Sequence, residues 1–474
     1  MYLFVFYILF YIIHISKFKF QNSKFKMKLL ILPHQLFPIE YIKKGLKEKT
    51  DEADEADDFE SVDSIILYEH PQYFKKYKFN KKKLVLHRAS MKYYADLLKK
   101  NNFKVQYVDF KTKLPSGKHL YFDPVDKLKL SGHMIETPNF LLSKELMEKY
   151  RKKTKTFMFS NFYMWSKKEL DIYPSLKSMD KMNRDRFNNK VKIPKLPSNS
   201  NTTSTKYIKE AITYVNSNFQ NNYGNTDGFM YPVTHKTAKK WLVDFFKKRL
   251  NNFGPYQDFV KKGEYFMFHS ILSSSINIGL LNPIDIIEEL AKYKSKVKIN
   301  SFEGYLRQLF WREYQRYCYI YAAADFKKNY FGNKKKLSKA WYTGELGIPP
   351  VDDFIKSGFE TAYMHHIGRL MFVGNFMNLS GISPKEGFRW FMEFSIDSYE
   401  WVMYQNVYDM VFFVTGGLTM RKPYVTSSNY ILKMSDYKQG GWSEKWTELY
   451  RKFMKKHKKK LWKFRYHFPQ LKNM

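Results

Sequence analysis

The stretch MKLLILPHQLF (27–37) decides the fold of the first part of this 474-residue chain. Its consecutive apolar residues run into a proline-containing turn, which predicts a buried β-strand that opens a domain. Three further runs predict strands: SIILYE (64–69), KLVLH (83–87) and FKVQYVDF (103–110). ASMKYYADLLKKN (89–101) has the apolar spacing of a helix. Strands alternating with helices predict an α/β domain at residues 27–160, Rossmann-like, with a parallel sheet.

The rest of the chain divides into three parts. Residues 161–235 are expected to connect the domains, and PSNSNTTST (197–205) predicts a surface linker within them. Helical periodicity dominates residues 236–474, which predicts a large all-helical domain, with Thr234 as the cap of its first helix. Residues 1–26 form an extension whose apolar run of about 16 residues is short for a membrane span. We expect no membrane association unless this extension is an anchor.

Composition limits the class of protein. The formal charge of +37 favours a polyanionic partner such as nucleic acid, although a biased genome composition would explain it equally well. Hydrophobic residues make up 44% of the chain, which excludes a disordered protein. Cys318 is the single cysteine, so one chain offers neither a disulfide framework nor a site built from several thiolates. The acidic stretch DEADEADDFE (51–60) is expected to be solvated and not a site.

Two segments carry groups suited to an anionic cofactor. HSILSSSINIGLLNP (269–283) offers hydroxyl and ring donors before a helical stretch, which suits a phosphate or pyrophosphate, although a serine-rich helix cap is the simpler interpretation of this segment alone. MHHIGRLM (364–371) places His366 and Arg369 on one helical face, and Asp397 can return to pair with Arg369. A core histidine and an ordinary ion pair are the alternative.

A third segment suits nucleic acid. The helix SFEGYLRQLFWREYQRY (301–317) spaces Gln308, Arg312 and Arg316 four residues apart with Trp311 beside them, which fits phosphates and unstacked bases as well as it fits a solvated basic face. The basic tail RKFMKKHKKKLWKFRYH (451–467) predicts a solvated face or a non-specific phosphate contact.

Several segments, taken in order, resemble one family. FGPYQDFVKKGEYFMFHSILSSSINIGLLNP (253–283) is similar to the flavin-binding stretch of photolyases. The remaining matching segments are EGYLRQLFWREY (303–314), WYTG (341–344), MHHIGRLMFVGNFMNLSGISP (364–384), YEWVMYQNV (399–407), KPYVTSSNYILKMSDY (422–437), ETPNFLL (136–142) and SMDKMNRDRF (178–187). Together they resemble the photolyase/cryptochrome superfamily, in its deoxyribodipyrimidine photolyase-related branch, the prokaryotic six-four photolyases that normally carry an iron–sulfur cluster.

The resemblance implies an antenna-type α/β domain and a helical domain that holds FAD in a folded shape. It places His269, Ser270, Leu272 and Ser273 around the FAD phosphates, and Arg369 and Asp397, with Asn406 as a weaker candidate, against the flavin ring. It assigns His366 to protonation of the six-four lesion. The remaining implied roles are a lesion pocket of Gln308, Trp311 and Arg312, an aromatic relay of Trp390 and Tyr430 with Trp341 or Tyr342 at its inner end, and an antenna contact at Glu69.

Three departures from the family pattern alter those expectations. The four cluster cysteines are missing after WYTG and after SDY, so we expect no iron–sulfur cluster and no other metal. Pro349, Pro350, Trp442 and Trp446 are candidates to fill that volume. The family's G-D-Q-L turn is replaced by PHQL (33–36), which puts a lumazine antenna in question, and the second active-site histidine of animal-type enzymes falls at Leu370.

The sequence therefore predicts a light-driven DNA repair lyase in which reduced FAD donates an electron to a flipped-out lesion, most consistently the six-four photoproduct. A cryptochrome-like blue-light photoreceptor, a cyclobutane pyrimidine dimer photolyase and a basic DNA-binding protein without flavin are the alternatives. The expected partner is UV-damaged DNA. We expect a monomer with no obligatory protein partner, located inside the cell wherever the DNA is.

Overall fold

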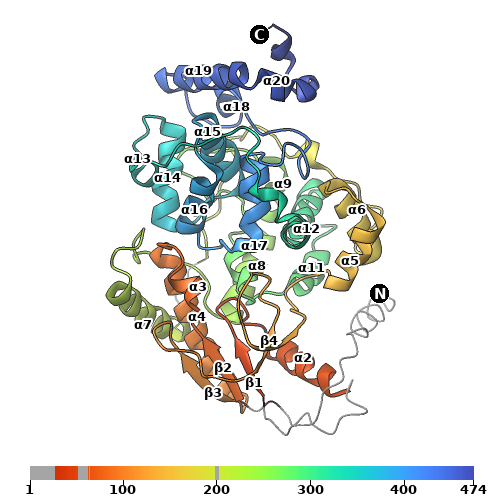
Figure 1. The fold of residues 1–474 in the computed structure, drawn as a ribbon, viewed down its shortest axis with the longest axis vertical. Helices are drawn as coiled ribbons and strands as arrows, with labels where there is room; N and C mark the ends of the chain where they lie inside the picture. The colour runs from red at the N-terminus through yellow and green to blue at the C-terminus, as the bar shows by residue number, and fades with distance from the viewer. Residues whose placement is uncertain (1–26, 52–61, 63, 198–201, 474) are drawn as a thin grey trace.

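The computed structural model describes residues 27–51, 62, 64–197 and 202–473. The N-terminal extension, residues 52–60 of the acidic stretch and residues 198–201 of the expected linker lie outside the described residues. Figure 1 shows a sheet with its helices at one end of the molecule and a larger helical half at the other. Among the described residues, no helix combines the length and apolar character that a membrane crossing requires.

Five parallel strands form the sheet, in the spatial order β3-β2-β1-β4-β5. The strands are β1 (Lys28–Ile31), β2 (Ser64–Tyr68), β3 (Lys104–Val108), β4 (His119–Phe122) and β5 (Gly132–Ile135). Leu29 and Leu30 of the central strand β1 are fully buried because helices cover both faces of the sheet. The α/β fold expected from the alternating pattern is confirmed, with two strands, β4 and β5, added to the expected set.

The expected strand at KLVLH (83–87) is wrong. These residues lie in α4 (Lys81–Lys100), which begins at the N-cap Asn80, whose side chain accepts a hydrogen bond from the backbone N–H of Lys82 at 3.0 Å. The run is apolar because this part of α4 is buried on all sides, between the sheet and the helical half, and not because it is a strand.

The described residues of the first half form five further helices. They are α2 (Ile39–Asp51), α3 (Pro71–Phe74), α5 (Lys144–Lys153), α6 (Phe159–Glu169) and α7 (Thr202–Asn218). The expected linker is wrong over residues 202–205, because α7 already begins at Thr202. Helix α7 packs along α4 (Figure 1), so part of the expected connector covers the α/β domain.

Every named element from residue 235 onward is helical, as expected. The α-helices are α8 (His235–Lys248), α9 (Leu250–Tyr256), α10 (Ser273–Asn277), α11 (Pro283–Ala291), α12 (Ile299–Ala322), α13 (Ala340–Thr343), α14 (Pro349–Thr361), α15 (Asn375–Leu379), α16 (Pro384–Phe394), α17 (Glu400–Met403), α18 (Ser428–Lys433), α19 (Gly441–Lys456) and α20 (Lys458–Leu461). Two π-helical segments, η3 (Gly368–Gly374) and η4 (Tyr404–Val411), interrupt them. Short 3₁₀ turns are η1 (Asp180–Met182), η2 (Asp325–Lys327), η5 (Trp462–His467) and η6 (Pro469–Asn473).

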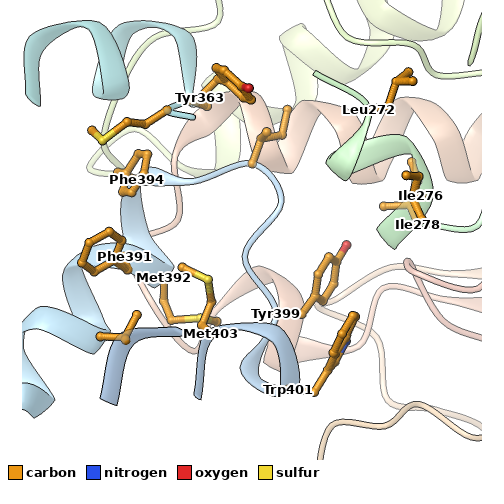
Figure 2. Packing of buried hydrophobic residues seen from close by; sticks show 14 of the residues in the cluster. Leu272, Ile276, Ile278, Tyr363, Phe391, Met392, Phe394, Tyr399, Trp401 and Met403 are labelled. Carbon is orange, nitrogen blue, oxygen red and sulfur yellow. The ribbon is translucent and has the colours of Figure 1, made fainter. Parts of the chain in front are cut away.

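Thr234 caps α8 as expected. Its hydroxyl accepts a hydrogen bond from the backbone N–H of Thr237 at 3.1 Å, and Thr237 returns the contact in a capping box. One continuous apolar core runs through both halves of the molecule. Figure 2 shows a part of it, in which Leu272 and Ile276 lie on one side, Phe391 and Phe394 lie on the other, and Tyr399 lies between them.

Candidate functional site

Asp397 is the point on which the expected cofactor residues converge. It lies in the turn between α16 and α17, and its carboxylate accepts hydrogen bonds from Arg369 at 3.0 and 3.1 Å and from the Ser273 hydroxyl at 2.6 Å. The Ser395 hydroxyl donates to it as well. Burial alone would raise the pKa of Asp397, but the positive charge of Arg369 and these hydroxyl donors outweigh it and lower the pKa below its ordinary value. The serine stretch and the Arg369 segment are therefore joined through one ionised carboxylate.

The backbone around this carboxylate is held in unusual conformations. Arg369 lies in the π-helical segment η3, a geometry often found at functional sites. Ile271 has φ of 57°, which is strained for a β-branched residue, and Ala362 has φ of 59°. Strained backbone of this kind persists where the surrounding contacts fix the chain conformation, and it is common at functional sites. Both positions flank segments that carry the expected site residues.

Three histidines meet beside the Arg369–Asp397 pair. The rings of His269 and His365 stack at 4.5 Å between centroids and 7° between planes, and His366 packs edge-on against His269 at 5.6 Å. Burial, followed by neighbouring positive groups, holds the pKa values of His269 and His365 well below the ordinary value, so both are neutral. The sequence interpretation missed His365, although it adjoins His366 in the same motif.

His366 differs from the other two because it reaches solvent. Its side chain is 40% exposed, and its Nε2 lies 3.2 Å from Oδ1 of Asp258. Arg184 contacts the other oxygen of Asp258 at 3.2 Å. Burial would raise the pKa of Asp258, but His366 and Arg184 lower it, so this carboxylate is ionised. Sequence interpretation missed Asp258, which lies 108 positions before His366, and gave Arg184 no individual role.

The three histidines bring their ring nitrogens within 4.8 Å of one another, a spacing that also occurs in metal sites. A metal ion must lie in the plane of each imidazole that binds it, about 2 Å from the nitrogen. The His269 and His365 rings are stacked, with 4.5 Å between their centroids and 7° between their planes, so one ion cannot lie in the planes of both rings. We therefore interpret the group as an aromatic stack of His269 and His365 beside the partly exposed His366.

The residues near the serine stretch fit an anionic, polar cofactor. The buried atoms Oγ of Ser274, Oγ of Ser275 and Nε2 of His269 have no hydrogen-bond partner within the described structure. Buried polar groups without partners are unfavourable, so their concentration here favours a ligand that accepts or donates to them. Ser270 and Leu272 lie in the same strained segment, and Leu272 precedes α10 directly.

The hydrogen bonds of Asn406 go to residues other than Arg369 and Asp397. Its amide oxygen accepts from Gln315 at 3.1 Å, and its amide nitrogen donates to the carbonyl of Val402 at 2.8 Å. Both ends of this amide are engaged within η4, α12 and α17.

The expected lesion residues on α12 point in different directions. Gln308 is partly exposed and lies 3.5 Å from Gln257, whereas the ring of Trp311 is covered by Phe159 at 3.6 Å. Arg312 points inward, where its guanidinium donates to Asn277 at 3.0 Å and to the carbonyl of Asn139 at 2.6 Å. Burial lowers its pKa to about 10.

Arg316, the third residue expected on this helix face, is fully buried. It pairs with Asp123 at 3.2 Å and with Glu136 at 2.6 Å, both from the α/β half. The expected solvated basic face of α12 is therefore wrong at this position, because the helix turns its arginines toward the first domain.

The expected relay residues form two groups. Trp390 donates through Nε1 to the carbonyl of Trp341 at 2.7 Å, and Phe359 bridges the rings of Trp390 and Tyr342 at 5.6 and 5.7 Å. Tyr430 lies instead near Asp258 and Arg184, on the His366 side of the site.

Glu69 does not offer a free carboxylate. It is fully buried, and it accepts from Arg88 at 2.9 Å, from the Tyr107 hydroxyl at 2.6 Å and from the Tyr214 hydroxyl at 3.0 Å. The Arg88 guanidinium also stacks over the Tyr214 ring at 3.8 Å. These contacts use both carboxylate oxygens, so the residues present do not fit an antenna that would bind to Glu69.

Apolar side chains pack in the region where the related family carries its cluster cysteines. Trp446 is fully buried, lies 5.1 Å from Phe376, and donates to the carbonyl of Thr426 at 3.0 Å. Pro350 is buried and Trp442 is partly buried, whereas Pro349 is exposed, so its expected role in filling this volume is wrong. Cys318 is buried in α12, and burial raises the pKa of its thiol well above the ordinary value.

Comparison with protein families matches both halves of the chain. Residues 29–121 and 121–231 match the model of the deoxyribodipyrimidine photo-lyase-related protein. Residues 305–471 match the FAD binding domain of DNA photolyase. The first model thus matches the α/β half, and the second matches most of the helical half; the descriptions of both models name photolyases.

Individual proteins give the same picture. A (6-4) photolyase of Agrobacterium fabrum is 40% identical over 236 residues, which cover 49% of this chain and 46% of that protein. The matched region thus spans about half the length of that curated relative. A bacterial class III photolyase from Agrobacterium tumefaciens has a similar fold, with a TM-score of 0.53 and 14% identity over 91% of this chain and 87% of that one. A cryptochrome from Synechocystis sp. PCC6803 matches with a TM-score of 0.54 and 15% identity over 90% and 89%.

Proposed function

Since the chain belongs to the photolyase/cryptochrome superfamily, we propose that it is a light-driven DNA photolyase that uses FAD to repair the six-four photoproduct. The observation that carries this proposal is the half-exposed His366, hydrogen-bonded to an ionised Asp258 and adjacent to the Arg369–Asp397 pair. A photoreceptor needs no proton donor facing solvent at this place. The 40% identity to a (6-4) photolyase supports the choice of lesion.

The residues that hold FAD in this proposal surround Asp397. The unpartnered Ser274, Ser275 and His269 atoms supply hydrogen bonds to its polar groups, and Arg369 faces the flavin ring with its charge fixed by Asp397. When bound and reduced, FAD supplies the light-driven electron that repair requires. The chain's task is to orient that cofactor and to exclude water from it.

His366 is the proton donor in this proposal. Asp258 accepts a hydrogen bond from its ring at 3.2 Å, which fixes the orientation of the imidazole. Arg184 in turn holds Asp258 in place. The damaged bases leave the duplex stack to reach this edge of the site, which requires less energy at a damaged step than at an intact one.

A single set of measurements tests the proposal. Purified protein is examined for a flavin absorption spectrum, reduced, illuminated with blue light, and assayed on oligonucleotides that carry one six-four photoproduct or one cyclobutane dimer. We expect repair of the six-four lesion, and its loss in His366→Ala with FAD still bound. His133→Ala, in strand β5 of the other half, is the matched control and is expected to repair normally.

Other outcomes separate the alternatives. Repair of cyclobutane dimers alone would replace the proposed lesion, and bound FAD without any repair would favour a photoreceptor. A colourless protein that still binds DNA would reject the flavin. Equal repair by His366→Ala would remove the proposed proton donor.

We also propose that the protein carries neither an iron–sulfur cluster nor an antenna at Glu69. One cysteine cannot supply four thiolates, and the Glu69 oxygens are already taken by Arg88, Tyr107 and Tyr214. Iron analysis is expected to show no stoichiometric iron. Action spectra of repair are expected to follow FAD absorption alone, and an additional band from a second chromophore would contradict this.

A further inference from the structure

The C-terminal end of the sequence carries many positively charged side chains and no negatively charged ones. Residues 451–473 contain no Asp or Glu, and their basic residues are Arg451, Lys452, Lys455, Lys456, Lys458, Lys459, Lys460, Lys463, Arg465 and Lys472. Lys452 is paired with Glu448 of the preceding turn. Lys455, Lys456 and Lys459 are exposed, and no partner is described for them.

This segment is folded and not a loose tail. Phe453, Leu461 and Leu471 are buried, and Phe453 packs against Phe331 at 4.8 Å. The Tyr330 hydroxyl donates to the carbonyl of Lys460 at 2.8 Å. The positive charges therefore lie on a folded part of the chain. Figure 1 shows α19 and α20 at the far end of the helical half.

Two aromatic side chains remain exposed on the same segment. Trp462 is 43% exposed and Tyr466 is 82% exposed, and Arg465 lies between them, 5.6 and 4.7 Å from their ring centroids. Large aromatic rings left in water are unfavourable unless a partner covers them. Exposed aromatic rings alternating with cations suit nucleic acid, because bases stack on the rings and phosphates pair with the cations.

The exposed cations and aromatic rings of this segment suit DNA better than they suit an anionic membrane. A helix that lies in a membrane surface needs a continuous apolar face, and the apolar face of this segment is already buried against the protein. Helix α19, whose last residues belong to this segment, packs on α18 through a 2.7 Å contact between Thr447 and Ser428, and α18 carries Tyr430.

We propose that residues 451–467 form a second DNA-binding surface, the C-terminal surface, which pairs its lysines with backbone phosphates and stacks Trp462 and Tyr466 on unpaired bases. The proposal extends the proposed repair function but requires neither flavin nor light. Binding to the C-terminal surface and repair at His366 can therefore fail separately.

Fluorescence anisotropy of the full chain with undamaged single-stranded and duplex DNA, measured across salt concentrations, tests the lysines. In Lys455→Ala/Lys456→Ala/Lys459→Ala we expect the slope of log K against log salt to fall by about 2 to 3, near one for each phosphate that the variant no longer neutralises. The control Lys99→Ala/Lys100→Ala/Lys209→Ala removes the same charge from α4 and α7 and is expected to change the slope by less than about 1. Equal slopes in both triple variants would overturn the proposal.

The aromatic residues have their own test. Trp462→Ala/Tyr466→Ala is expected to weaken single-strand binding at least about fivefold, the smallest change that losing one stacked base predicts, and to affect duplex binding less. No change on either DNA would reject the stacking role. Binding of the wild type to anionic phospholipid vesicles, lost in these variants while their DNA binding persists, would assign the surface to membranes instead. Circular dichroism spectra that match the wild type establish that each variant is folded.

Discussion

Asp397→Asn tests how strongly the buried ion pair holds the candidate site together. The side chains of Arg369 and Asp397 are only 18% and 9% exposed, so the substitution leaves a largely buried guanidinium without a negative partner. Removing one member of a buried pair destabilises a protein by about 3–5 kcal/mol. The amide oxygen of Asn still accepts from the serine hydroxyls and part of the site reaches water, so we expect a loss near the lower limit, about 3 kcal/mol.

Glu448→Gln is the matched control. It breaks the Glu448–Lys452 pair on α19, whose side chains are 63% and 70% exposed, and exposed pairs contribute at most about 1 kcal/mol. Both variants are unfolded in urea without FAD at pH 7, followed by tryptophan fluorescence and by circular dichroism, so that coincident transitions establish two-state behaviour. If Asp397→Asn loses no more stability than Glu448→Gln, the reasoning from burial is refuted.

The pH dependence of the same comparison gives a second check. Because folding lowers the pKa of Asp397, the carboxylate stabilises the folded state fully above its ordinary pKa of 3.8. That contribution is lost as the pH falls through the lower pKa of the folded state. The difference between wild type and Asp397→Asn is therefore expected to stay constant from pH 7 to 5 and to shrink below about pH 4. A difference that grows on acidification would contradict the assigned ionisation.

Three further predictions concern the core. Burial, only partly offset by Asp397, lowers the pKa of Lys83 from 10.5 to about 7, so between these pH values the unfolded chain binds more protons than the folded chain. The stability of the wild type in urea should therefore rise from pH 7 to 9, by up to about 1.4 kcal/mol per pH unit. Lys83→Met should lose this rise. The thiol of Cys318 should react with Ellman's reagent only after unfolding, to one equivalent, and reaction in the native state would contradict its burial. In Gly387→Ala the new Cβ would lie 2.3 Å from the Phe412 ring, so thermal unfolding should show a loss of stability of about 1–3 kcal/mol. In the control Gly441→Ala the new Cβ would have no atom within 4 Å, so stability should change by less than about 1 kcal/mol.

Local signals in the sequence were sufficient where the chain determines its own conformation. Thr234 as a helix cap and the strands β1, β2 and β3 were predicted because local patterns act over a few positions: capping at Thr234, consecutive burial in β1 and β2, and alternation in β3. The KLVLH run was predicted wrongly because three consecutive apolar residues, Leu84 to Leu86, suit a buried strand and a buried helix equally. The neighbouring Asn80, a cap three residues before it, was the available signal.

The candidate site divides in the same way. The Arg369–Asp397 pair was predicted from complementary charges and is present at 3.0 Å. Asp258 was missed because nothing in its local sequence distinguishes it from any surface aspartate; only folding brings it to His366.

The amino-acid sequence by itself determined the α/β and helical halves, the single thiol, the positive charge and the residue types available for a flavin. The tertiary structure alone decided which way each of those side chains points. Arg316 faces Asp123 and Glu136 while His366 reaches solvent, and no spacing rule distinguishes these outcomes. The physical reason is that a helix fixes the angle between its side chains, whereas the face that becomes buried depends on which distant elements pack against it.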